Sequence, residues 1–252
     1  MFSINTQKPS KEFIECWNAA GHHLQTQVQG FLSWIKADLI PPQIEHLSFR
    51  MGNQLFFIRV EDVNNHIHGP GNLDGLIDLA KKCNGIPCLL VMKKGFRGNW
   101  KADNPGWGLT HASTHEVIVP PELVTDEKIE MTDWELQDFA VQVVRDHLRQ
   151  QGKQIMSFCG NPHVSPSLWF IENEKPAWVI VKVARHPSAL PALPADAGKI
   201  AAQCSSLGNI GYFAPLVVAS GEDSQTATPL LRGHEMLVKY EGLKSLAALQ
   251  LT

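Results

Sequence analysis

Residues 53–62 read NQLFFIRVED, residues 73–83 read LDGLIDLAKKC and residues 85–95 read GIPCLLVMKKG. The same order returns as AWVIVKVAR at 177–185, DAGKIAAQC at 196–204 and GYFAPLVVASG at 211–221. Each copy is an apolar strand with a cation, a loop, a short helix that ends in A-x-x-C, and a second apolar strand. Recurrence of one supersecondary unit predicts that the chain contains one fold twice.

The segments around each copy extend the repeat. Phe13, Trp17, Leu24, Val28, Phe31 and Ile35 recur at helical spacing, which predicts a long first helix from Ser10 to the pair Pro41-Pro42. Gly52-Asn53 is typical of a hairpin turn, and Thr132 with Glu135 matches a capping box at the start of a second long helix. Each half therefore reads as a helix, a three-strand meander, a helix and one or two strands.

The strands of both copies are apolar on both faces, which places them in sheets covered on both sides. The predicted fold class is α/β (α+β), with two mixed sheets flanked by helices. We expect a first repeat over 1–119, a linker over 120–131 that begins at Pro120-Pro121, and a second repeat over 132–252. A monomer whose halves pack about a pseudo-twofold axis, as a fused homodimer would, is the expected assembly.

The composition argues against nucleic-acid-binding and membrane proteins. The 252 residues are 44% hydrophobic and 19% charged, with a net charge of −3. Nucleic-acid binding is not favoured, because the chain has no basic excess, although a local basic patch stays open. The five cysteines lack CxxC spacing, which predicts buried thiols in a reducing compartment. The sequence has no signal-peptide core and no apolar run of membrane length. We therefore expect a cytoplasmic protein without membrane association.

The order of helix, three strands, helix and strand resembles the core of the PD-(D/E)xK nuclease superfamily. The resemblance implies an Asp on one strand and, on the next, an acidic residue two positions before a Lys. In the second half Lys182 takes the Lys position, Ile180 the acid position, and Ser165 or Ser167 the Asp position. In the first half Arg59 and Phe57 take the Lys and acid positions, and the earlier strand offers only Glu45.

Both acid positions are apolar, and a hard divalent cation needs carboxylate oxygens. We therefore expect no metal site, no cofactor and no catalytic residue, as in a degenerate nuclease-like protein. The chaperone fold of type III secretion systems is a rival resemblance. It has a helix, three strands, a helix, two strands and a helix, and the second half fits this order equally well.

Arg59 and Lys182 are lone cations in apolar strands, and two interpretations apply to them. In the first, they bind a ligand. In the second, their stems lie along the sheet while their charged ends reach its rim or pair with a carboxylate, such as Glu61 or Asp62 for Arg59. We favour the second interpretation.

Residues 95–115, GFRGNWKADNPGWGLTHASTH, form the segment richest in functional residue types. Long loops in compact domains are usually functional or mobile, and Trp and Arg are enriched at binding hot spots. The candidate binding surface comprises Arg97, Trp100, Lys101, Trp107 and His111, with Arg232 and His234 as the counterparts in the second half. The tryptophans either anchor the loop on the core or contact a partner, and both alternatives stay open.

The sequence thus predicts a non-catalytic binding or adaptor protein that engages a macromolecule, most naturally another protein. The alternative is a metal-dependent nuclease whose carboxylates lie elsewhere in the chain. The two hypotheses differ in whether magnesium or manganese binds and whether nucleic acid is cleaved.

Overall fold

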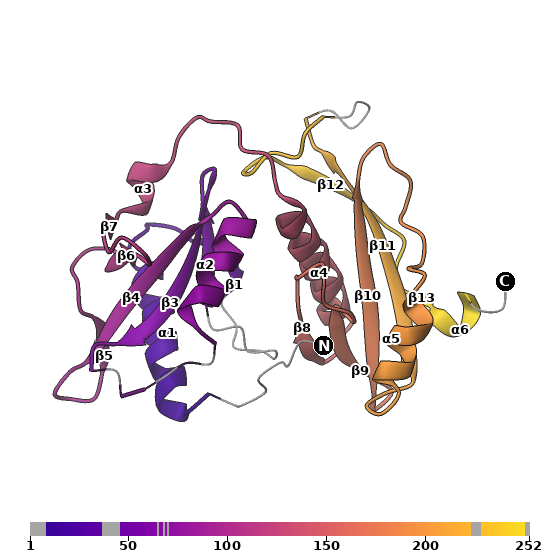
Figure 1. Ribbon diagram of the computed structural model, residues 1–252, viewed down its shortest axis with the longest axis horizontal. Coiled ribbons are helices and arrows are strands. Elements are labelled where there is room, and N and C mark those ends of the chain that lie inside the picture. The colour runs from indigo at the N-terminus through magenta and orange to yellow at the C-terminus, as the bar shows by residue number, and fades with distance from the viewer. Residues whose placement is uncertain are drawn as a thin grey trace. The chain divides into compact units, whose positions relative to one another are not determined.

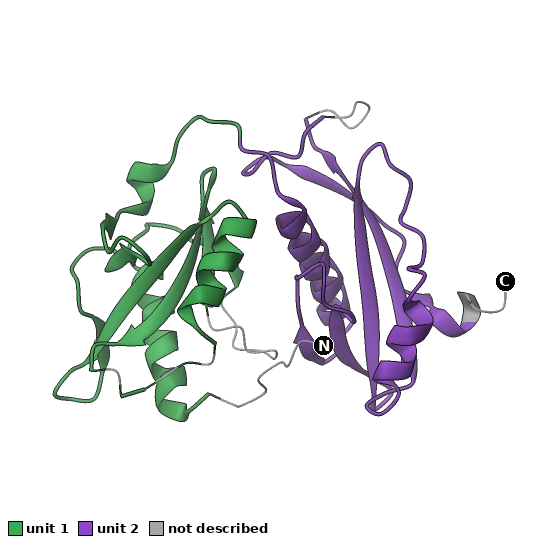
Figure 2. Cartoon of the chain, viewed as in Figure 1, with its two compact units in different colours: residues 1–128 green, residues 129–252 purple. Residues whose placement is uncertain are grey.

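The computed structural model describes residues 9–36, 46–64, 66–67, 69, 71–222 and 228–249. The chain divides into two compact units, residues 1–128 and residues 129–252 (Figure 2). Each unit contains one mixed sheet with helices against it (Figure 1). The predicted duplicated α+β fold with two mixed sheets is confirmed, whereas the pseudo-twofold packing of the halves stays a prediction.

Unit 1 is built on a seven-stranded sheet in the order β1-β2-β3-β4-β6-β7, with β5 also paired to β4. Its elements are α1 (Lys11–Gln25), β1 (Ser33–Lys36), β2 (His46–Met51), β3 (Gln54–Asp62), α2 (Leu73–Lys82), β4 (Ile86–Lys94), β5 (Trp100–Ala102), β6 (Leu109–His111), β7 (Val117–Ile118) and α3 (Pro120–Leu123). Strands β1 to β3 form an antiparallel meander, and β4 returns through α2 to lie parallel to β3.

Unit 2 repeats this plan on a six-stranded sheet in the order β12-β11-β10-β9-β8, with β13 also paired to β11. Its elements are α4 (Asp133–Gln150), β8 (Ile155–Phe158), β9 (Leu168–Glu172), β10 (Lys175–Arg185), α5 (Ala197–Cys204), β11 (Ile210–Ser220), β12 (Met236–Tyr240), β13 (Lys244–Ser245) and α6 (Leu246–Leu249). Strand β11 is parallel to β10, as β4 is to β3. The halves diverge only after these parallel strands.

The two helices of each repeat cover opposite faces of its sheet. In unit 1, Phe56 and Ile58 of β3 join α1 in the core, whereas the alternate residue Arg59 lies beside α2. In unit 2, Trp178 and Ile180 of β10 pack with α5, and α4 covers the other face. The period of two along a strand produces this division, and it explains why both central strands are apolar on both sides.

The hairpin turns fix which positions correspond. Gln54 and Lys175 are the first residues after the two turns, so Phe57 corresponds to Trp178. Each of these aromatic side chains contacts a glycine that precedes the strand after the second helix, β4 in unit 1 and β11 in unit 2. A Cβ at Gly85 would lie 2.6 Å from the Phe57 ring. Trp178 Nε1 donates to Gly208 O at 3.1 Å. Arg59 and Lys182 lie on equivalent strands, as predicted.

Arg59 and Lys182 do not, however, occupy equivalent positions within these two strands. Counted from the turns, Arg59 corresponds to Ile180, and Lys182 corresponds to Glu61. The shift is two residues, so all four side chains remain on the face of the second helix. Cys83 and Cys204 end equivalent helices and are both buried, as predicted.

The first helix is shorter than the periodicity predicts. It begins at the expected N-cap, where Ser10 Oγ accepts from Phe13 N at 3.0 Å, but it ends at Gln25. The Gln25 side chain donates to Gly30 O at 2.6 Å and accepts from Leu32 N at 3.3 Å, which fixes a turn into β1. The expected end at Pro41-Pro42 lies outside the described residues.

The predicted linker over 120–131 is divided between the units. In unit 1, Pro120 is buried, and Asn53 donates to Thr125 Oγ1 at 2.9 Å and to Glu127 O at 2.8 Å. In unit 2, Met131 N donates to Leu230 O at 2.8 Å. The segment is therefore bound to its neighbours by specific hydrogen bonds on both sides of the boundary at residue 128.

Candidate functional site

The segment 95–115 is a folded extension of the sheet, whereas its glycines predicted a long loop. Strand β5 pairs with the end of β4, and β6 pairs with its middle. A tight turn joins β4 to β5: Gly95 N donates to Asn99 O at 2.8 Å, and Gly98 N donates to Gly95 O at 2.8 Å. Gly98 has a φ of +81°, a conformation that glycine adopts without the steric cost of a Cβ.

The tip of this hairpin presents one aromatic and one cationic side chain. Phe96 has a relative exposure of 108%, so none of the residues that the structure describes covers it. Arg97 beside it is exposed, and so is Lys101 on β5. The sequence prediction named Arg97 and Lys101 but missed Phe96, whose only signal is its place between Gly95 and Gly98 in a tight turn.

The base of the hairpin is held by two ion pairs. Lys93 Nζ lies 2.9 Å from Asp103 Oδ1, and Lys94 Nζ lies 2.5 Å from Glu12 Oε1 of α1. The hydrogen bond to Glu12 raises the pKa of Lys94. Lys94 Nζ also lies 5.6 Å from the centroid of the Trp100 ring, a cation–π distance. These contacts join the end of β4 to β5 and to α1.

The two tryptophans of the segment are anchors for the core. Trp107 is 9% exposed and stacks on Phe49, with ring centroids 6.0 Å apart and an interplanar angle of 25°. Trp100 is half-buried against the same core, and its Nε1 has no hydrogen-bond partner among the described residues. The alternative in which the tryptophans contact a partner is thus not supported by their burial.

His111 holds a turn. Its Nδ1 accepts hydrogen bonds from Ser113 N and Thr114 N, each at 3.2 Å, at the turn from β6 into β7. The His111 imidazole is therefore hydrogen-bonded to the backbone of its own turn. Of the five residues predicted in this segment, Arg97 and Lys101 are exposed, and the other three stabilise it.

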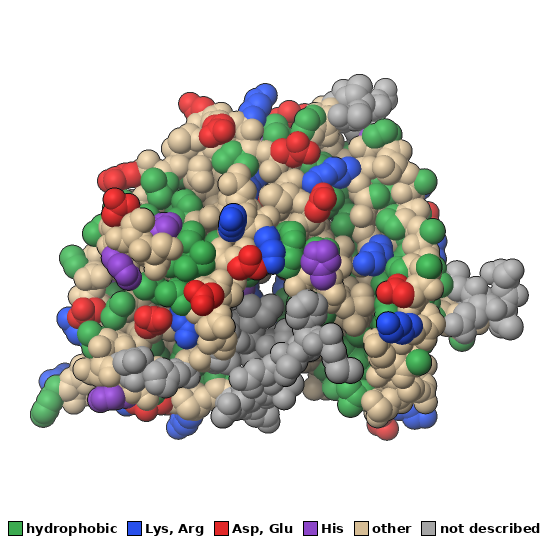
Figure 3. Space-filling model, in the orientation of Figure 1, with side chains coloured by type: hydrophobic (Ala, Val, Ile, Leu, Met, Phe, Trp, Pro, Cys, Tyr) green, Lys and Arg blue, Asp and Glu red, His purple; other side chains and the backbone are tan. Residues whose placement is uncertain are grey.

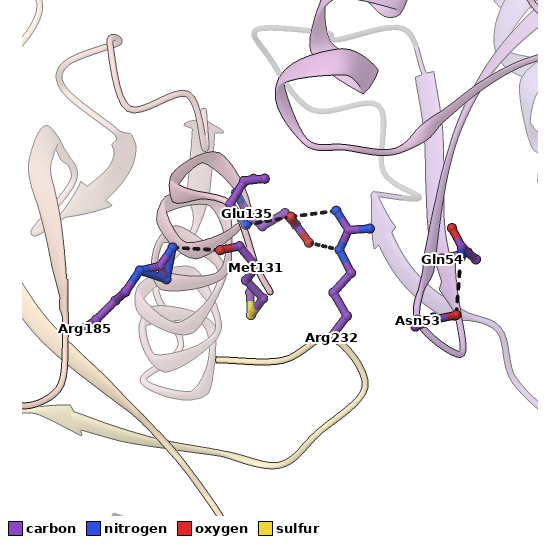
Figure 4. A network of polar contacts seen from close by, with 7 residues as sticks. Asn53, Gln54, Met131, Glu135, Arg185 and Arg232 are labelled. Carbon is purple, nitrogen blue, oxygen red and sulfur yellow. Dashed lines mark hydrogen bonds and ion pairs between the residues drawn. The ribbon is translucent and has the colours of Figure 1, made fainter. Parts of the chain in front are cut away.

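Arg232 is buried, whereas the sequence prediction placed it on an exposed surface. Its side chain is 1% exposed and its Nε and Nη2 donate to the two carboxylate oxygens of Glu135, at 2.7 and 2.8 Å (Figure 4). Glu135 Oε2 also accepts from Thr132 N at 2.9 Å, which completes the predicted capping box. Arg232 therefore joins the segment before β12 to the start of α4.

His234 remains near the surface. Its Nδ1 lies 2.7 Å from Glu222 Oε1, and the two side chains are 31% and 58% exposed. Strand β12 begins at Met236, so His234 precedes it. The two second-half counterparts thus differ, since one is part of the core and the other forms a surface contact.

The central-strand cations have different surroundings. Arg59 is 14% exposed, and its Nε donates to Glu61 Oε1 at 3.1 Å, the pairing that the sequence suggested. Asp62, the other suggested partner, instead accepts from the backbone of Asn64 and His66. Lys182 is half-buried on the face of α5 and forms no side-chain hydrogen bond or ion pair with the residues that the structure describes.

The positions that would hold acids in a nuclease are deep in the two cores. Phe57 is 5% exposed and Ile180 is fully buried. Within the described residues, no group of three or more His, Cys, Asp or Glu side chains is arranged to hold a metal ion. On the face of the molecule shown in Figure 3, acidic and basic side chains are interspersed.

Comparison with known proteins relates part of this chain to a family. Residues 134–246 match a family model described as a domain of unknown function, DUF8840. The match extends from α4 to the first residue of α6, inside unit 2, and covers less than half of the chain. No curated protein and no solved structure matches the chain. In the described part, none of the helices is both long and apolar enough to cross a membrane. Unit 2 is therefore similar to a domain of unknown function.

Proposed function

We propose that this chain is a non-catalytic binding protein that engages a protein partner through the tip of the β4–β5 hairpin, residues 95–99. The observation on which the proposal rests is the complete exposure of Phe96 at the tip of a hydrogen-bonded β-hairpin. The strand positions that would hold nuclease acids contain Phe57 and Ile180, so the proposal includes no catalytic step.

Phe96 can contribute much of the free energy of binding. Burying a phenylalanine side chain stabilises a complex by about 1.5–3 kcal/mol relative to leaving the ring in water. The turn hydrogen bonds and the pairs of Lys93 and Lys94 order the backbone below it before any partner binds. Because a preorganised anchor loses little conformational entropy on binding, more of this gain appears as affinity.

The charges near the tip indicate the chemistry of the partner. Lys93 and Lys94 are neutralised by Asp103 and Glu12, whereas Arg97 and Lys101 form no ion pair with any described residue. A complementary surface would contain an apolar pocket for the ring, with carboxylates at its rim. Such rim charges accelerate association and select among partners more than they increase affinity.

The experiment compares matched substitutions in the full chain. Phe96→Ser and Arg97→Glu change the tip, and Phe31→Ser changes a phenylalanine that is 98% exposed elsewhere in unit 1. Tagged variants would be purified from the native cells, and the co-purifying proteins quantified by mass spectrometry. We expect one set of proteins to be lost with Phe96→Ser and Arg97→Glu and retained with Phe31→Ser.

Direct contact is then measured with the purified candidate. A photo-crosslinking amino acid at position 96 should join the two chains, and Phe96→Ser should weaken the affinity by about tenfold or more, as at a hot spot. Equal recovery of every co-purifying protein with all three variants would show that the tip is not the binding surface.

A further inference from the structure

A cavity of about 250 Å³ lies in unit 1 on the face of the sheet that α2 covers. It is lined by His46, Arg59, Asn72, Gly75, Leu76 and Leu79. His46 of β2 and Arg59 of β3 are direct cross-strand partners. Because their neighbours Leu47 and Ile58 belong to the core on the α1 side, the side chains of His46 and Arg59 face α2.

His46 is the side chain that indicates a ligand. It is 7% exposed and forms no hydrogen bond with any residue in the described part of the chain, although it lines the cavity. Its ring contacts Phe57, with centroids 5.5 Å apart. The ring nitrogens of His46 are not among the fully buried atoms without a partner, so they reach solvent and are available to a ligand in the cavity.

Arg59 supplies positive charge and donors to the same space. Of its five N–H groups, the one on Nε donates to Glu61, and the four on the terminal nitrogens have no acceptor among the described residues. Arg59 is the cationic residue among those that line the cavity, and Glu61 is its acidic partner on this face.

The N-terminus of α2 forms another wall. The helix has ten residues and begins at Leu73, after the cap Asn72, whose Oδ1 accepts from Gly75 N at 2.7 Å. The amide groups of a first helical turn lack intrahelical acceptors and attract anions. Leu76 and Leu79 complete the lining with apolar side chains. The cavity therefore combines the guanidinium group of Arg59 and backbone donors of α2, whose first turn also contains Asp74, with an apolar wall.

We propose that this cavity binds a small organic carboxylate, with Arg59 pairing the carboxylate group, His46 donating a hydrogen bond to it, and Leu76 and Leu79 contacting its hydrocarbon part. The guanidinium group has the planar geometry that matches a carboxylate. The volume is below the ~300–1,000 Å³ of sites for drug-sized ligands, which favours a short ligand. This site is independent of the hairpin tip.

The test uses the full-length chain labelled with ¹⁵N, titrated with hexanoate at constant pH and ionic strength. Hexanol, inorganic phosphate and sodium chloride are the comparison probes, and acetyl-glutamate amide represents a carboxylate that belongs to another protein. We expect hexanoate to produce saturable shifts of the amides in the first turn of α2, and the other probes to produce weak or no saturable shifts. Equal binding of phosphate or hexanol, or binding of acetyl-glutamate amide alone, would overturn the assignment of a free organic carboxylate.

Two pairs of variants locate the site. Arg59→Gln removes the proposed cation, whereas Arg50→Gln removes a cation from the same strand pair and the same face, outside the lining residues. We expect Arg59→Gln to weaken hexanoate binding by about tenfold or more and Arg50→Gln to leave it within about twofold. Equal weakening by both variants would mean that general positive charge, and no specific site, attracts the anion.

The second pair covers the case in which Arg59→Gln fails to fold. Leu79→Phe fills the apolar end of the cavity without changing charge, and should abolish hexanoate binding while the amide spectrum remains folded. Glu61→Gln removes the negative charge beside Arg59 and should leave binding equal or stronger, since no carboxylate then competes with the ligand for the guanidinium charge. Unchanged binding in Leu79→Phe would place hexanoate outside the cavity and refute the proposal.

Discussion

Arg232 and Glu135, separated by 97 positions in the chain, form a bidentate ion pair that is almost completely buried. The same carboxylate accepts the N–H of Thr132, so it caps α4 and binds the segment before β12 at once. Backbone bonds from Arg232 N to Ile129 O and from Met131 N to Leu230 O run alongside. The pair therefore attaches the start of unit 2 to a segment near its end.

Arg232→Met should destabilise unit 2 strongly. The substitution leaves Glu135 buried without its charge partner, and breaking one side of a buried pair costs about 3–5 kcal/mol of the free energy of unfolding. Urea denaturation of the full chain, followed by hydrogen exchange of residues 129–150, measures the loss and locates it. Lys11→Met is the control, because its pair with Glu15 is exposed and should contribute less than about 1 kcal/mol. Similar stability of the two variants would contradict the buried pair.

Trp107→Ala should destabilise the protein strongly, whereas Phe96→Ala should leave its stability nearly unchanged. Trp107 is 9% exposed and stacked on Phe49, so its truncation should cost about 3–5 kcal/mol. Phe96 contacts no core, so its truncation should change the free energy of unfolding by less than about 0.5 kcal/mol. Thermal and urea unfolding of both variants check this. A large loss in Phe96→Ala would mean that the ring packs on the protein and is not available to a partner.

The repeated architecture was predictable because its signals are local. Apolar strands, the Gly52-Asn53 turn and the Thr132–Glu135 capping box each act over a few residues, and all of them are found in the structure. The length of the first helix was not predictable in this way. Periodicity continues through Val28 and Phe31, but the helix ends at Gln25, whose side chain binds the backbone at Gly30. This contact spans only five positions, but the spacing of apolar residues does not reveal it.

The candidate site was predictable only in part. Residue types led to the 95–115 segment, but type does not determine exposure: Trp107 and Arg232 are buried, while Phe96 is fully exposed. Glycines suggested a loop where they form tight turns between short strands, as at Gly98. The cavity could not be found at all, because His46 and Arg59 become neighbours only through the register of β2 and β3.

His46 should make stability depend on pH. Burial, and then the charge of Lys36, lower the pKa of His46 from 6.5 to about 3. Arg59 is its cross-strand partner on this face, and Glu61 pairs with Arg59. Between these pH values the unfolded chain binds a proton that the folded chain does not. The free energy of unfolding therefore contains the full contribution of neutral His46 above about pH 6.5, and this contribution is lost progressively as the pH falls towards 3.

The measurement compares the wild-type chain with His46→Gln, which does not titrate. From about pH 6.5 to about pH 5, the wild-type free energy of unfolding should fall by about 1–2 kcal/mol more than that of the variant. Carboxylates and the other histidines change the free energy of unfolding of both proteins equally, so their contributions cancel when the two pH profiles are subtracted. Parallel pH profiles for the two proteins would show that His46 is protonated in the folded state or exposed to solvent.

Cys159 should be the most reactive thiol in the folded chain. Burial, followed by the charges of Asp62 and Glu12, raises the pKa of Cys16 to about 12, and burial raises the pKa of Cys88 to about 12. Since the thiolate is the nucleophile, these groups are almost wholly in the unreactive form near neutral pH.

Cys83 and Cys204 are also buried, and burial raises the pKa of Cys204 to about 11, whereas Cys159 is partly exposed. Brief treatment of the native protein with iodoacetamide near pH 8, followed by peptide mass spectrometry, should therefore modify Cys159 first and the other four only after denaturant is added. Modification of Cys204 as rapid as that of Cys159 would mean that α5 opens from its sheet on the time scale of the reaction, because Cys204 belongs to the buried cluster of Trp178 and Ile180.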